Sequence, residues 1–488
     1  MRLTSSTTTL SPTDLSAFAE CSHRTLLDFA AARKLLKRPG RNEIELELLE
    51  KRGREHEARV LAHFQGQGLE VHTASLHLTD PERGARETAE AMGRGFDVIY
   101  QGTLLQDGWV GRPDFLLKVD DGHYEPADAK LARSAKAAAI LQLCAYVEAL
   151  GATQGRAPEH FHLALGTEPL DLPRLRAADF MAYYRRAKAQ LGEFVREIGQ
   201  REDLAASIEV AGGQLQERAT SSEGKDARNG LPYPEPVSHC GVCDWWKRCE
   251  DRRRADDHLS LVASITRKQR DRLADQCTTR VTELAALSPS ARVPGIEPEP
   301  LTRIREQARI QVEGREEKRT KHELLADFDP GSGLEALPKP SPGDLFFDLE
   351  GDAFYESTGL EYLFGLVELG QISRSFTERT AAGPPKYLSH WATSRVEEKA
   401  AFEAVIDRIQ AGRAELADMH VYHFGHREAD AVRRLSCFHK TREDAVDDML
   451  RNHVFVDLHR IVRQSLRASV ESYSLQLLEP LYGFTRKT

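Results

Sequence analysis

The chain has 488 residues, of which 40% are hydrophobic and 29% are charged, and its formal net charge is −9 at pH 7. This composition is typical of a soluble globular protein with roughly two to four domains. The negative charge argues against a generally basic nucleic-acid binder but is compatible with a local basic channel. No apolar run approaches the roughly 20 residues of a membrane helix, and the N-terminus lacks signal-peptide features. We therefore expect a cytoplasmic protein with no membrane partner.

The first part of the chain is predicted to be helical. Ser11–Leu15 has the pattern of a helix start, and Cys21 follows in the same stretch. A longer helical pattern covers Glu43–Phe64, although Gly53 interrupts it at a cost of about 1 kcal/mol relative to alanine. This second helix carries His56, which by itself would be an exposed histidine on a charged face.

The next stretch predicts a hairpin that carries two carboxylates and a lysine. Val110–Val119 and Tyr124–Leu131 are β-prone, and the turn sequence DDG lies between them. The first strand carries Asp114. The second carries Asp128 and Lys130, which point to the same face because they are two residues apart. Two convergent carboxylates suit a hard divalent cation, and a neighbouring ammonium can hold a water, although an Asp–Lys pair beside a turn is more often a solvated surface.

A strong helical pattern follows at Ala132–Leu150. It places Gln142 and Tyr146 four residues apart and therefore on one face. The two side chains could be polar groups at the edge of a core, or they could bind a phosphate or a base beside a metal. Further along, the sequence predicts a strand at Phe161–Gly166, a helix at Ala177–Arg201 and a polar loop at Ser221–Asn229.

Three of the seven cysteines lie within ten residues, in the spacing C-x₂-C-x₅-C: Cys240, Cys243 and Cys249. In a reducing compartment such a group indicates a metal or a cluster rather than disulfides. The fourth ligand would be one of Cys21, Cys144, Cys277, Cys437 and His239. Spacing alone does not distinguish a tetrahedral zinc from an iron–sulfur cluster.

The remaining chain predicts a helical segment followed by a new domain. Residues 265–287 form two short helices, either a hairpin that grips a DNA backbone or a connector, and Pro-rich stretches near residues 289–300 and 338–343 mark a boundary. The run Leu345–Leu349 is typical of a buried strand and carries Asp348, with Glu350 on the same face. Charge in a buried strand is costly without a cation or partner. Later segments supply Glu428 and Asp457.

Residues 1–260 resemble the iron–sulfur-containing RecB branch of the PD-(D/E)xK nucleases. The resemblance rests on the motifs RGREHE, GRPDF, PADAK and QLCAY and on the order of the cysteines. It implies a restriction-endonuclease-like core in which Mg²⁺ or Mn²⁺ is bound by His56, Asp114 and Asp128. It also implies that Lys130 positions the attacking water and that Gln142 and Tyr146 support substrate binding. A [4Fe–4S] cluster would be held by Cys21, Cys240, Cys243 and Cys249.

Residues 342–488 resemble the RNase H-like DEDD exonucleases, and the whole arrangement resembles the RecB-like nuclease family that pairs these two modules, sometimes with a helicase. Asp348 and Glu350 match the first motif. Glu428 matches the second less cleanly, and Asp457 lies in the next strand motif. A last helix with another catalytic aspartate is expected in this family and is absent from the sequence, so we expect an incomplete second module.

These observations predict an α/β (α+β) protein in three parts. Residues 1–260 would form the nuclease with its iron–sulfur clasp, residues 261–341 a helical connector, and residues 342–488 an RNase H-like domain. The expected function is metal-dependent hydrolysis of DNA that is single-stranded or has a free end, in repair, recombination or defence, with a helicase as a possible partner. The alternatives are a 3′–5′ exonuclease acting through the C-terminal domain and a non-catalytic nucleic-acid-binding adaptor with a four-cysteine Zn²⁺ site.

Overall fold

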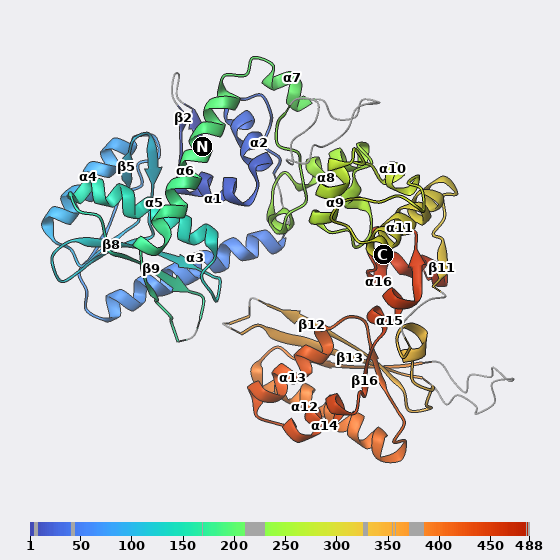
Figure 1. Ribbon diagram of the computed structural model, residues 1–488. Helices are drawn as coiled ribbons and strands as arrows, with labels where there is room; N and C mark the ends of the chain where they lie inside the picture. The colour runs from blue at the N-terminus through green and yellow to red at the C-terminus, as the bar shows by residue number, and fades with distance from the viewer. Residues whose placement is uncertain are drawn as a thin grey trace. The chain divides into compact units, whose positions relative to one another are not determined.

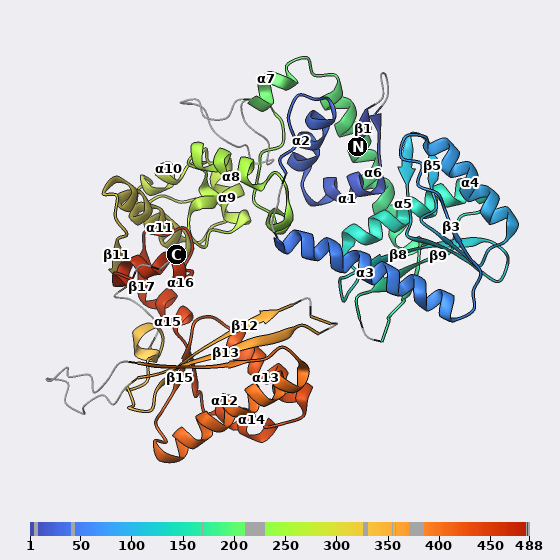
Figure 2. The same ribbon diagram turned by 180° about the vertical axis from the view of Figure 1, so that it is seen from behind.

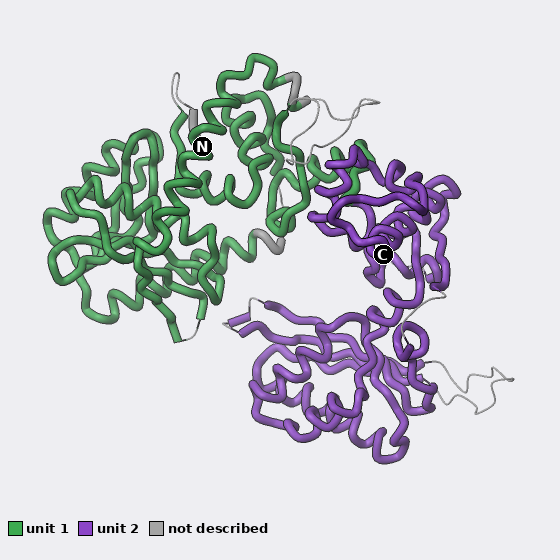
Figure 3. The backbone as a smooth tube through the Cα atoms, viewed as in Figure 1, with its two compact units in different colours: residues 1–260 green, residues 261–488 purple. Residues whose placement is uncertain are grey.

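The computed structural model forms two compact units, residues 1–260 and residues 261–488 (Figure 3). It describes residues 1–3, 8–40, 44–167, 169–209, 230–325, 330–353, 355–356, 358–369, 385–484 and 486. The polar loop predicted at Ser221–Asn229 lies outside these ranges. Within them, none of the helices combines the length and the apolar character that crossing a membrane requires.

Unit 1 begins with three helices: α1 (Pro12–Glu20), α2 (Ser22–Ala32) and α3 (Ile44–Gly66). Ser11 caps α1 and forms a capping box with Asp14. The sequence pattern predicted that Cys21 lies inside a helix. In the structure it has an extended conformation between α1 and α2. The interruption expected at Gly53 is absent, and α3 runs through it, because packing of the buried residues Val60 and Phe64 outweighs the weak propensity of a single glycine.

The sheet of unit 1 has six strands in the order β10-β9-β8-β7-β4-β3. The strands are β3 (Val71–Thr73), β4 (Val98–Tyr100), β7 (Phe115–Lys118), β8 (Tyr124–Lys130), β9 (His160–Leu165) and β10 (Arg174–Arg176). β7 and β8 pair antiparallel, whereas β8 and β9 pair parallel. The single strand predicted at Val110–Val119 is wrong: it divides into β6 (Trp109–Gly111) and β7, because Pro113 lacks an amide for a ladder hydrogen bond.

Helices cover both faces of this sheet. On one face α3, seen in Figure 2, contributes Val60 and Phe64 to a core with Phe115 and Ala127. Helix α5 (Ala137–Gln154) packs on the other face, and α6 (Ala178–Gly199) packs against α5. The rest of unit 1 consists of β1 (Arg2–Leu3), β2 (Thr8–Thr9), α4 (Pro81–Arg94), β5 (Leu104–Gln106), α7 (Leu204–Glu209), the 3-10 helices η1 (Ser238–Val242) and η2 (Leu259–Leu261), and α8 (Trp246–Ala255).

Unit 2 opens with the predicted helical segment. It contains α9 (Arg267–Asp275), α10 (Val281–Ala285), α11 (Pro298–Glu316), β11 (His322–Leu324) and η3 (Gly333–Ala336). β11 pairs with β17 (Leu466–Ala468), and Gln307 of α11 donates a hydrogen bond to the Ala468 carbonyl at 2.9 Å. The segment expected to be a separate connector is therefore packed on the end of the chain, because long-range strand pairing joins the two.

The main sheet of unit 2 has the strand order β14-β13-β12-β15-β16. The strands are β12 (Leu345–Asp352), β13 (Leu360–Glu368), β14 (Lys386–Trp391), β15 (Val421–His423) and β16 (Phe455–Asp457). β12 pairs antiparallel with β13 and parallel with β15. One face of the sheet is covered by α12 (Arg395–Glu415), α13 (Arg427–His439) and α14 (Glu443–Arg451), as Figure 1 shows. The chain continues with α15 (Leu458–Ser465), α16 (Leu475–Leu478) and η4 (Glu479–Tyr482).

Candidate active sites

The hairpin of unit 1 brings two carboxylates and a lysine together at one end of β8. The amide of Asp114 donates to Asp128 Oδ1 at 3.1 Å, and the amide of Ala129 donates to Asp114 Oδ2 at 2.8 Å. Each carboxylate is thus held by the backbone of the opposite segment. Lys130 Nζ lies 2.9 Å from Asp128 Oδ2, because the two residues share one face of the strand.

The two carboxylates repel each other where little water is present. Burial and the charge of Asp128 raise the pKa of Asp114 to about 7, and Glu57 adds to this effect while Lys130 opposes it. Burial lowers the pKa of Lys130, but Asp128 and Asp114 outweigh burial and the net shift is upward. Because double ionisation of the pair is unfavourable, the donor set fits a hard cation that would neutralise it.

Tyr146 of α5 closes this site from the helix side. Its hydroxyl donates to the Arg112 carbonyl at 3.1 Å, and its side chain is buried. Burial, followed by the charges of Asp128 and Asp114, raises the pKa of Tyr146 well above its ordinary value. A Cβ atom on Gly111 would lie 2.8 Å from the Tyr146 ring, so the close approach requires glycine. Tyr146 therefore holds the segment that leads into Asp114.

His56 and Gln142, which the motifs assign to the same site, have other partners. His56 is buried, its Nε2 donates to the Ala164 carbonyl at 3.0 Å, and its Nδ1 accepts from Arg59 at 3.3 Å. Gln142 Nε2 donates to Thr13 Oγ1 at 3.3 Å. These contacts hold the two side chains to the surrounding elements rather than to the carboxylate pair.

Glu57 is the α3 residue whose charge acts on the site, and the sequence pattern did not single it out. It accepts a hydrogen bond from Gln101, and its charge raises the pKa values of Asp114 and Lys130. Successive helix residues are rotated by about 100°, so His56 and Glu57 reach different groups: His56 bonds the Ala164 carbonyl on β9, whereas the charge of Glu57 acts on Asp114. The only signal for Glu57 in the sequence was that an acidic residue follows His56 in the motif RGREHE.

The structure brings the four cysteines of the predicted cluster into one neighbourhood. Burial raises the pKa values of Cys21 and Cys243 and raises that of Cys249 to about 12, and neighbouring thiols of the same group, Cys240 among them, add to each shift. The Cys21 thiol also accepts from the Arg24 amide at 3.4 Å, at the start of α2. Residues more than 200 positions apart in the chain thus meet at one place.

Of the other candidate ligands, His239 lies beside this group but has partners of its own, and the remaining cysteines lie elsewhere. His239 Nδ1 is 2.8 Å from Glu20 Oε2, and its Nε2 contacts Arg24, so both ring nitrogens are engaged. Cys144 of α5 is buried in the core, whereas Cys277 and Cys437 are exposed. Among the alternatives that the sequence left open, the spatial grouping favours Cys21 as the fourth thiol.

In unit 2, Asp348 and Glu350 project from one face of β12. Leu345, Phe347 and Leu349 alternate with them and are buried under the helices, whereas Asp348 and Glu350 are exposed. The expectation of a buried strand therefore holds for only one face of β12, and the face that carries Asp348 and Glu350 is open. Because side chains alternate with a period of two, helices on one side bury only every second residue.

Glu428, in the first turn of α13, lies close enough to Asp348 to affect the pKa of that carboxyl group. Burial and the charge of Glu428 raise the pKa of Asp348. Glu428 Oε2 lies 3.4 Å from His423 Nδ1, both side chains are buried, and neither atom has a hydrogen-bond partner among the described residues. Buried polar atoms of this kind are commonly satisfied by an ion or a water, so the donor set around Asp348 fits a cation.

Asp457 has a structural role in this arrangement. It is the last residue of β16, and its Oδ1 accepts from the amides of Gly425 at 3.0 Å, His459 at 2.9 Å and Arg460 at 3.2 Å. These bonds cap α15 and fix the loop after β15. Asp457 therefore holds together the strand ends beside Asp348 through its first carboxylate oxygen.

A cavity of about 930 Å³ lies over the open face of the same sheet, with Asp348 and Glu350 in its lining. Strand register places Phe346 beside Val367 and Val367 beside Tyr387. Phe346 also stacks on Tyr422, with ring centroids 5.4 Å apart. The cavity thus combines exposed carboxylates with an aromatic surface on which planar rings can stack.

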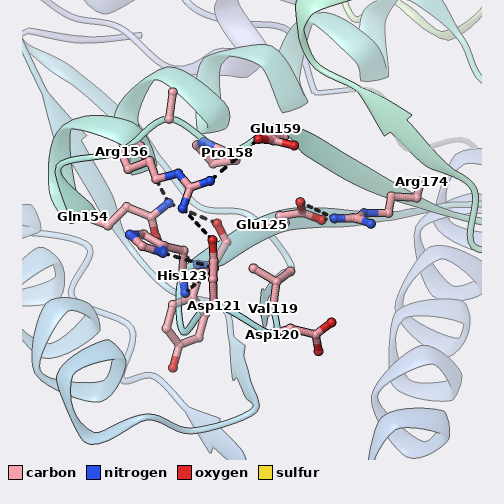
Figure 4. A pocket seen from close by; sticks show the side chains of 12 residues that line it. Val119, Asp120, Asp121, His123, Glu125, Gln154, Arg156, Pro158, Glu159 and Arg174 are labelled. Atoms are coloured by element: carbon pink, nitrogen blue, oxygen red, sulfur yellow. Dashed lines mark hydrogen bonds and ion pairs between the residues drawn. The ribbon is translucent and has the colours of Figure 1, made fainter.

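A second hollow, of about 220 Å³, opens at the other end of β8 (Figure 4). Arg174 binds Glu125 through two hydrogen bonds of 3.0 and 2.8 Å, and Arg156 lies 2.6 Å from Asp121. Burial raises the pKa of Glu125, but His162 and Arg174 outweigh it and lower the pKa to about 2. Both arginines here are paired with carboxylates, so this hollow is separate in position and chemistry from the Asp114–Asp128 pair.

Within the described ranges, no three His, Cys, Asp or Glu side chains are grouped closely enough to hold a metal ion as they stand. The Asp114–Asp128 pair supplies two carboxylates, and the Asp348 region supplies a carboxylate pair near a buried Glu428. The four thiols form a neighbourhood rather than a closed tetrahedron. Each site therefore has donors that suit a cation but does not surround one as it stands.

Comparison with known proteins identifies part of the chain. A family model of the RNase_H superfamily matches residues 345–488, which include the five-stranded sheet of unit 2. No curated protein matches the chain. Domains of this superfamily are generally nucleic-acid hydrolases that use Mg²⁺ or Mn²⁺. The match therefore indicates an RNase H-like C-terminal domain with nuclease-type activity on a nucleic-acid substrate.

Proposed function

We propose that this protein is a metal-dependent DNA nuclease in which unit 1 hydrolyses phosphodiester bonds at Asp114, Asp128 and Lys130. The observation that carries the proposal is the reciprocal locking of the two carboxylates across the hairpin, with Lys130 at 2.9 Å from Asp128. Two carboxylates are costly to keep together unless a cation neutralises them. Their position therefore makes sense as a binding site for Mg²⁺ or Mn²⁺.

The chain's own groups supply the rest of the chemistry. A metal ion bound there would lower the pKa of a bound water and neutralise charge on the scissile phosphate. Lys130 uses one ammonium proton on Asp128 and has two more to orient a water or a phosphate oxygen. Glu57 is the additional ligand that we propose from α3, because its charge acts on Asp114 and Lys130 whereas the ring nitrogens of His56 have other partners. Tyr146 acts by holding the segment before Asp114 in place.

We further propose that Cys21, Cys240, Cys243 and Cys249 hold a structural [4Fe–4S] cluster. Their mutual electrostatic influence supports a shared site, and burial disfavours free thiolates there unless a metal binds them. The cluster would tie the α1–α2 junction to η1 and α8. Iron and zinc content distinguish this proposal from a four-cysteine zinc site: about four irons with absorption near 400 nm, against one zinc and no colour.

The C-terminal domain is a second candidate nuclease, as a 3′–5′ exonuclease on a single-stranded end. The superfamily match and the carboxylates Asp348 and Glu350 support it. The cavity beside them has aromatic walls, including Phe346 and Tyr387, which suit stacking of unpaired bases better than binding of a rigid duplex. A helicase acting in the same pathway would supply such single strands.

Two substitutions in the full-length protein test these proposals. Cleavage of end-labelled single-stranded and duplex DNA is measured with Mg²⁺, with Mn²⁺ and with a chelator. Lys130→Ala should remove the activity of unit 1, and Asp348→Asn should remove that of unit 2. Lys118→Ala is the matched control, because Lys118 is an exposed lysine on the neighbouring strand β7.

The pattern of results assigns the chemistry. If Lys130→Ala leaves cleavage intact and Asp348→Asn abolishes it, the proposal for unit 1 fails and the C-terminal domain is the nuclease. Binding without metal-dependent cleavage in the unsubstituted protein would reject both and leave a nucleic-acid-binding adaptor.

A further inference from the structure

Arg427 stands beside the carboxylates of the C-terminal domain. It is the first residue of α13 and lines the same cavity as Asp348 and Glu350. Its side chain is 49% exposed, and its charge lowers the pKa of Asp348, opposing the effect of Glu428. A half-exposed cation is thus available at the edge of a carboxylate site that is proposed to act on an anionic polymer.

Glu361 of β13 holds Arg427 in place through an ion pair. Glu361 Oε2 accepts from Arg427 Nη2 at 3.1 Å, and Oε1 accepts from Arg434 Nη2 at 2.6 Å. The Glu361 side chain is only 10% exposed, and its amide donates to the buried Glu398 at 2.7 Å. Each oxygen of a fixed carboxylate therefore orients one arginine of α13.

Gly351 allows this ion pair to lie against the strand that carries Asp348. The register of β12 and β13 shifts between Glu350 and Gly351. A Cβ atom on Gly351 would lie 2.1 Å from Glu361 Oε2 and 2.9 Å from Arg427 Nη2. No side chain fits there without displacing the pair. The bulge and the glycine thus bring the guanidinium next to the residues Asp348 and Glu350.

We propose that Arg427 binds a phosphate of a single-stranded nucleic acid beside Asp348 and Glu350, and that Glu361 is the positioning residue that aims it. A guanidinium has five N–H donors in a planar fork, and the ion pair with Glu361 uses one side of it. The remaining donors match two oxygens of a phosphodiester. The inference rests on the proposed nuclease function of this domain and names one of its substrate contacts.

Arg434 provides a matched comparison within the same helix. It binds the other oxygen of Glu361 and is 42% exposed, close to the exposure of Arg427. Of the two arginines, only Arg427 is among the described residues that line the cavity. If the Glu361 cluster is purely structural, nucleic acid should change the reactivity of both arginines alike. If Arg427 binds a phosphate, nucleic acid should change the reactivity of Arg427 alone.

Chemical protection tests the contact locally and without cleavage. The full-length protein is treated with phenylglyoxal, an arginine-specific reagent, with and without single-stranded oligothymidylate, with Ca²⁺ replacing Mg²⁺. Peptide mass mapping then gives the modification of each arginine. We expect the oligonucleotide to slow modification of Arg427 several-fold and to leave Arg434 unchanged. Equal protection of both residues, or protection of neither, would overturn the proposal.

Kinetics in a Lys130→Ala background separate this proposal from the proposed function of the domain. Arg427→Met should raise the KM for single-stranded DNA about tenfold with a smaller change in kcat, and reduce the slope of log KM against log salt by about 0.7. Glu361→Gln should give part of the same effect, and Arg427→Lys should restore part of the affinity. Arg434→Met should change thermal stability but neither KM nor the salt slope.

Failure of the phosphate contact and failure of catalysis by the C-terminal domain would give different results. Protection of Arg427 without any cleavage by the Lys130→Ala protein would keep the phosphate site and reject catalysis by the C-terminal domain. Cleavage that depends on Asp348 but is unaffected in KM and salt slope by Arg427→Met would keep catalysis and reject the phosphate contact.

Discussion

The two carboxylate sites of this chain are built in opposite ways. In unit 1, Asp114 and Asp128 are held by each other's backbone, and Asp128 is only 2% exposed. In unit 2, Asp348 and Glu350 stand on an open sheet face, under a cavity of about 930 Å³. In unit 1 the hydrogen bonds fix the positions of the two carboxylates at an electrostatic cost. In unit 2 the open sheet face leaves the carboxylates accessible, and a bound ligand would fix their final positions.

This difference has a consequence for substitutions. At the closed site, a change in any member alters both the fold and the chemistry, because the same bonds serve both. At the open site, activity and stability can be separated, because exposed carboxylates contribute little to folding. The following predictions test that contrast.

The largest effect is expected from Asp128→Asn compared with Glu350→Gln. Asp128→Asn removes a proposed cation ligand and the partner of Lys130, so cleavage by unit 1 should fall about 100- to 10,000-fold. It should also destabilise the protein by about 1–3 kcal/mol, since a largely buried ion pair is broken. Cleavage assays and urea unfolding measure the two effects.

Glu350→Gln is the counterpart at the open site. It should lower any cleavage by the C-terminal domain and change stability by no more than about 0.5 kcal/mol. A destabilisation equal to that of Asp128→Asn would show that the two sites are equally tied to the fold and would remove the contrast.

The next largest effect concerns the cysteine group. Cys249→Ser should abolish the visible absorption and lower the melting temperature by roughly 10 °C, because a bound cluster stabilises only the folded state. Iron analysis and thermal unfolding under anaerobic conditions measure both. Cys277→Ser is the control, since Cys277 is exposed. Retention of full iron content by Cys249→Ser would exclude this residue as a ligand.

A pH-dependent effect is expected at Asp114. Its pKa in the folded protein is raised from 3.8 to about 7, so the folded state binds the proton more tightly than the unfolded state. The stability contribution of the protonated form is complete below pH 3.8 and is lost as the pH rises through 7. In the metal-free protein, Asp114→Asn should therefore be more stable than the parent by about 1–3 kcal/mol at pH 8.

Urea unfolding between pH 5 and pH 8 in a chelator checks this sign. The difference between variant and parent should grow up to pH 7 and then level off, and Mg²⁺ or Mn²⁺ should reduce it by stabilising the parent. A difference that does not vary with pH would indicate repacking rather than relief of charge.

The smallest effect is expected from Tyr146→Phe. Loss of the hydrogen bond from the hydroxyl to the Arg112 carbonyl should cost about 1 kcal/mol of stability and reduce cleavage by unit 1 several-fold. Gly111→Ala should act in the same direction, because its Cβ would press on the Tyr146 ring. Tyr183→Phe, at an exposed tyrosine of α6, is the control. Unchanged cleavage in Tyr146→Phe would limit Tyr146 to a packing role.

Much of the local structure of the first site follows from the sequence. The turn DDG, the β-prone residues of β8 and the helical pattern of α5 predicted the hairpin and the helix behind it. The shared face of Asp128 and Lys130 followed from the two-residue period of a strand. The break before β7 did not follow from the pattern, because β-prone residues lie on both sides of Pro113.

Long-range choices were harder to predict. Helical periodicity placed α3 but could not decide which groups His56 and Glu57 would reach, because tertiary packing sets the rotation of a helix. The D-x-E pattern placed Asp348 and Glu350 on one face of a strand. It could not tell that this face would stay open, because that depends on where the helices pack.

The sequence by itself therefore determined which residues share a helix or strand face, since the backbone repeats of 3.6 and 2 residues are local properties. It also supplied the chemically distinctive carboxylates, lysine and cysteines. Only the tertiary structure decided that Cys21 meets the later cysteines, that Glu57 acts on Asp114, and that Gly351 lets Arg427 approach Asp348. Long-range contacts of this kind depend on burial and loop closure over long stretches of chain, and local sequence patterns do not contain that information.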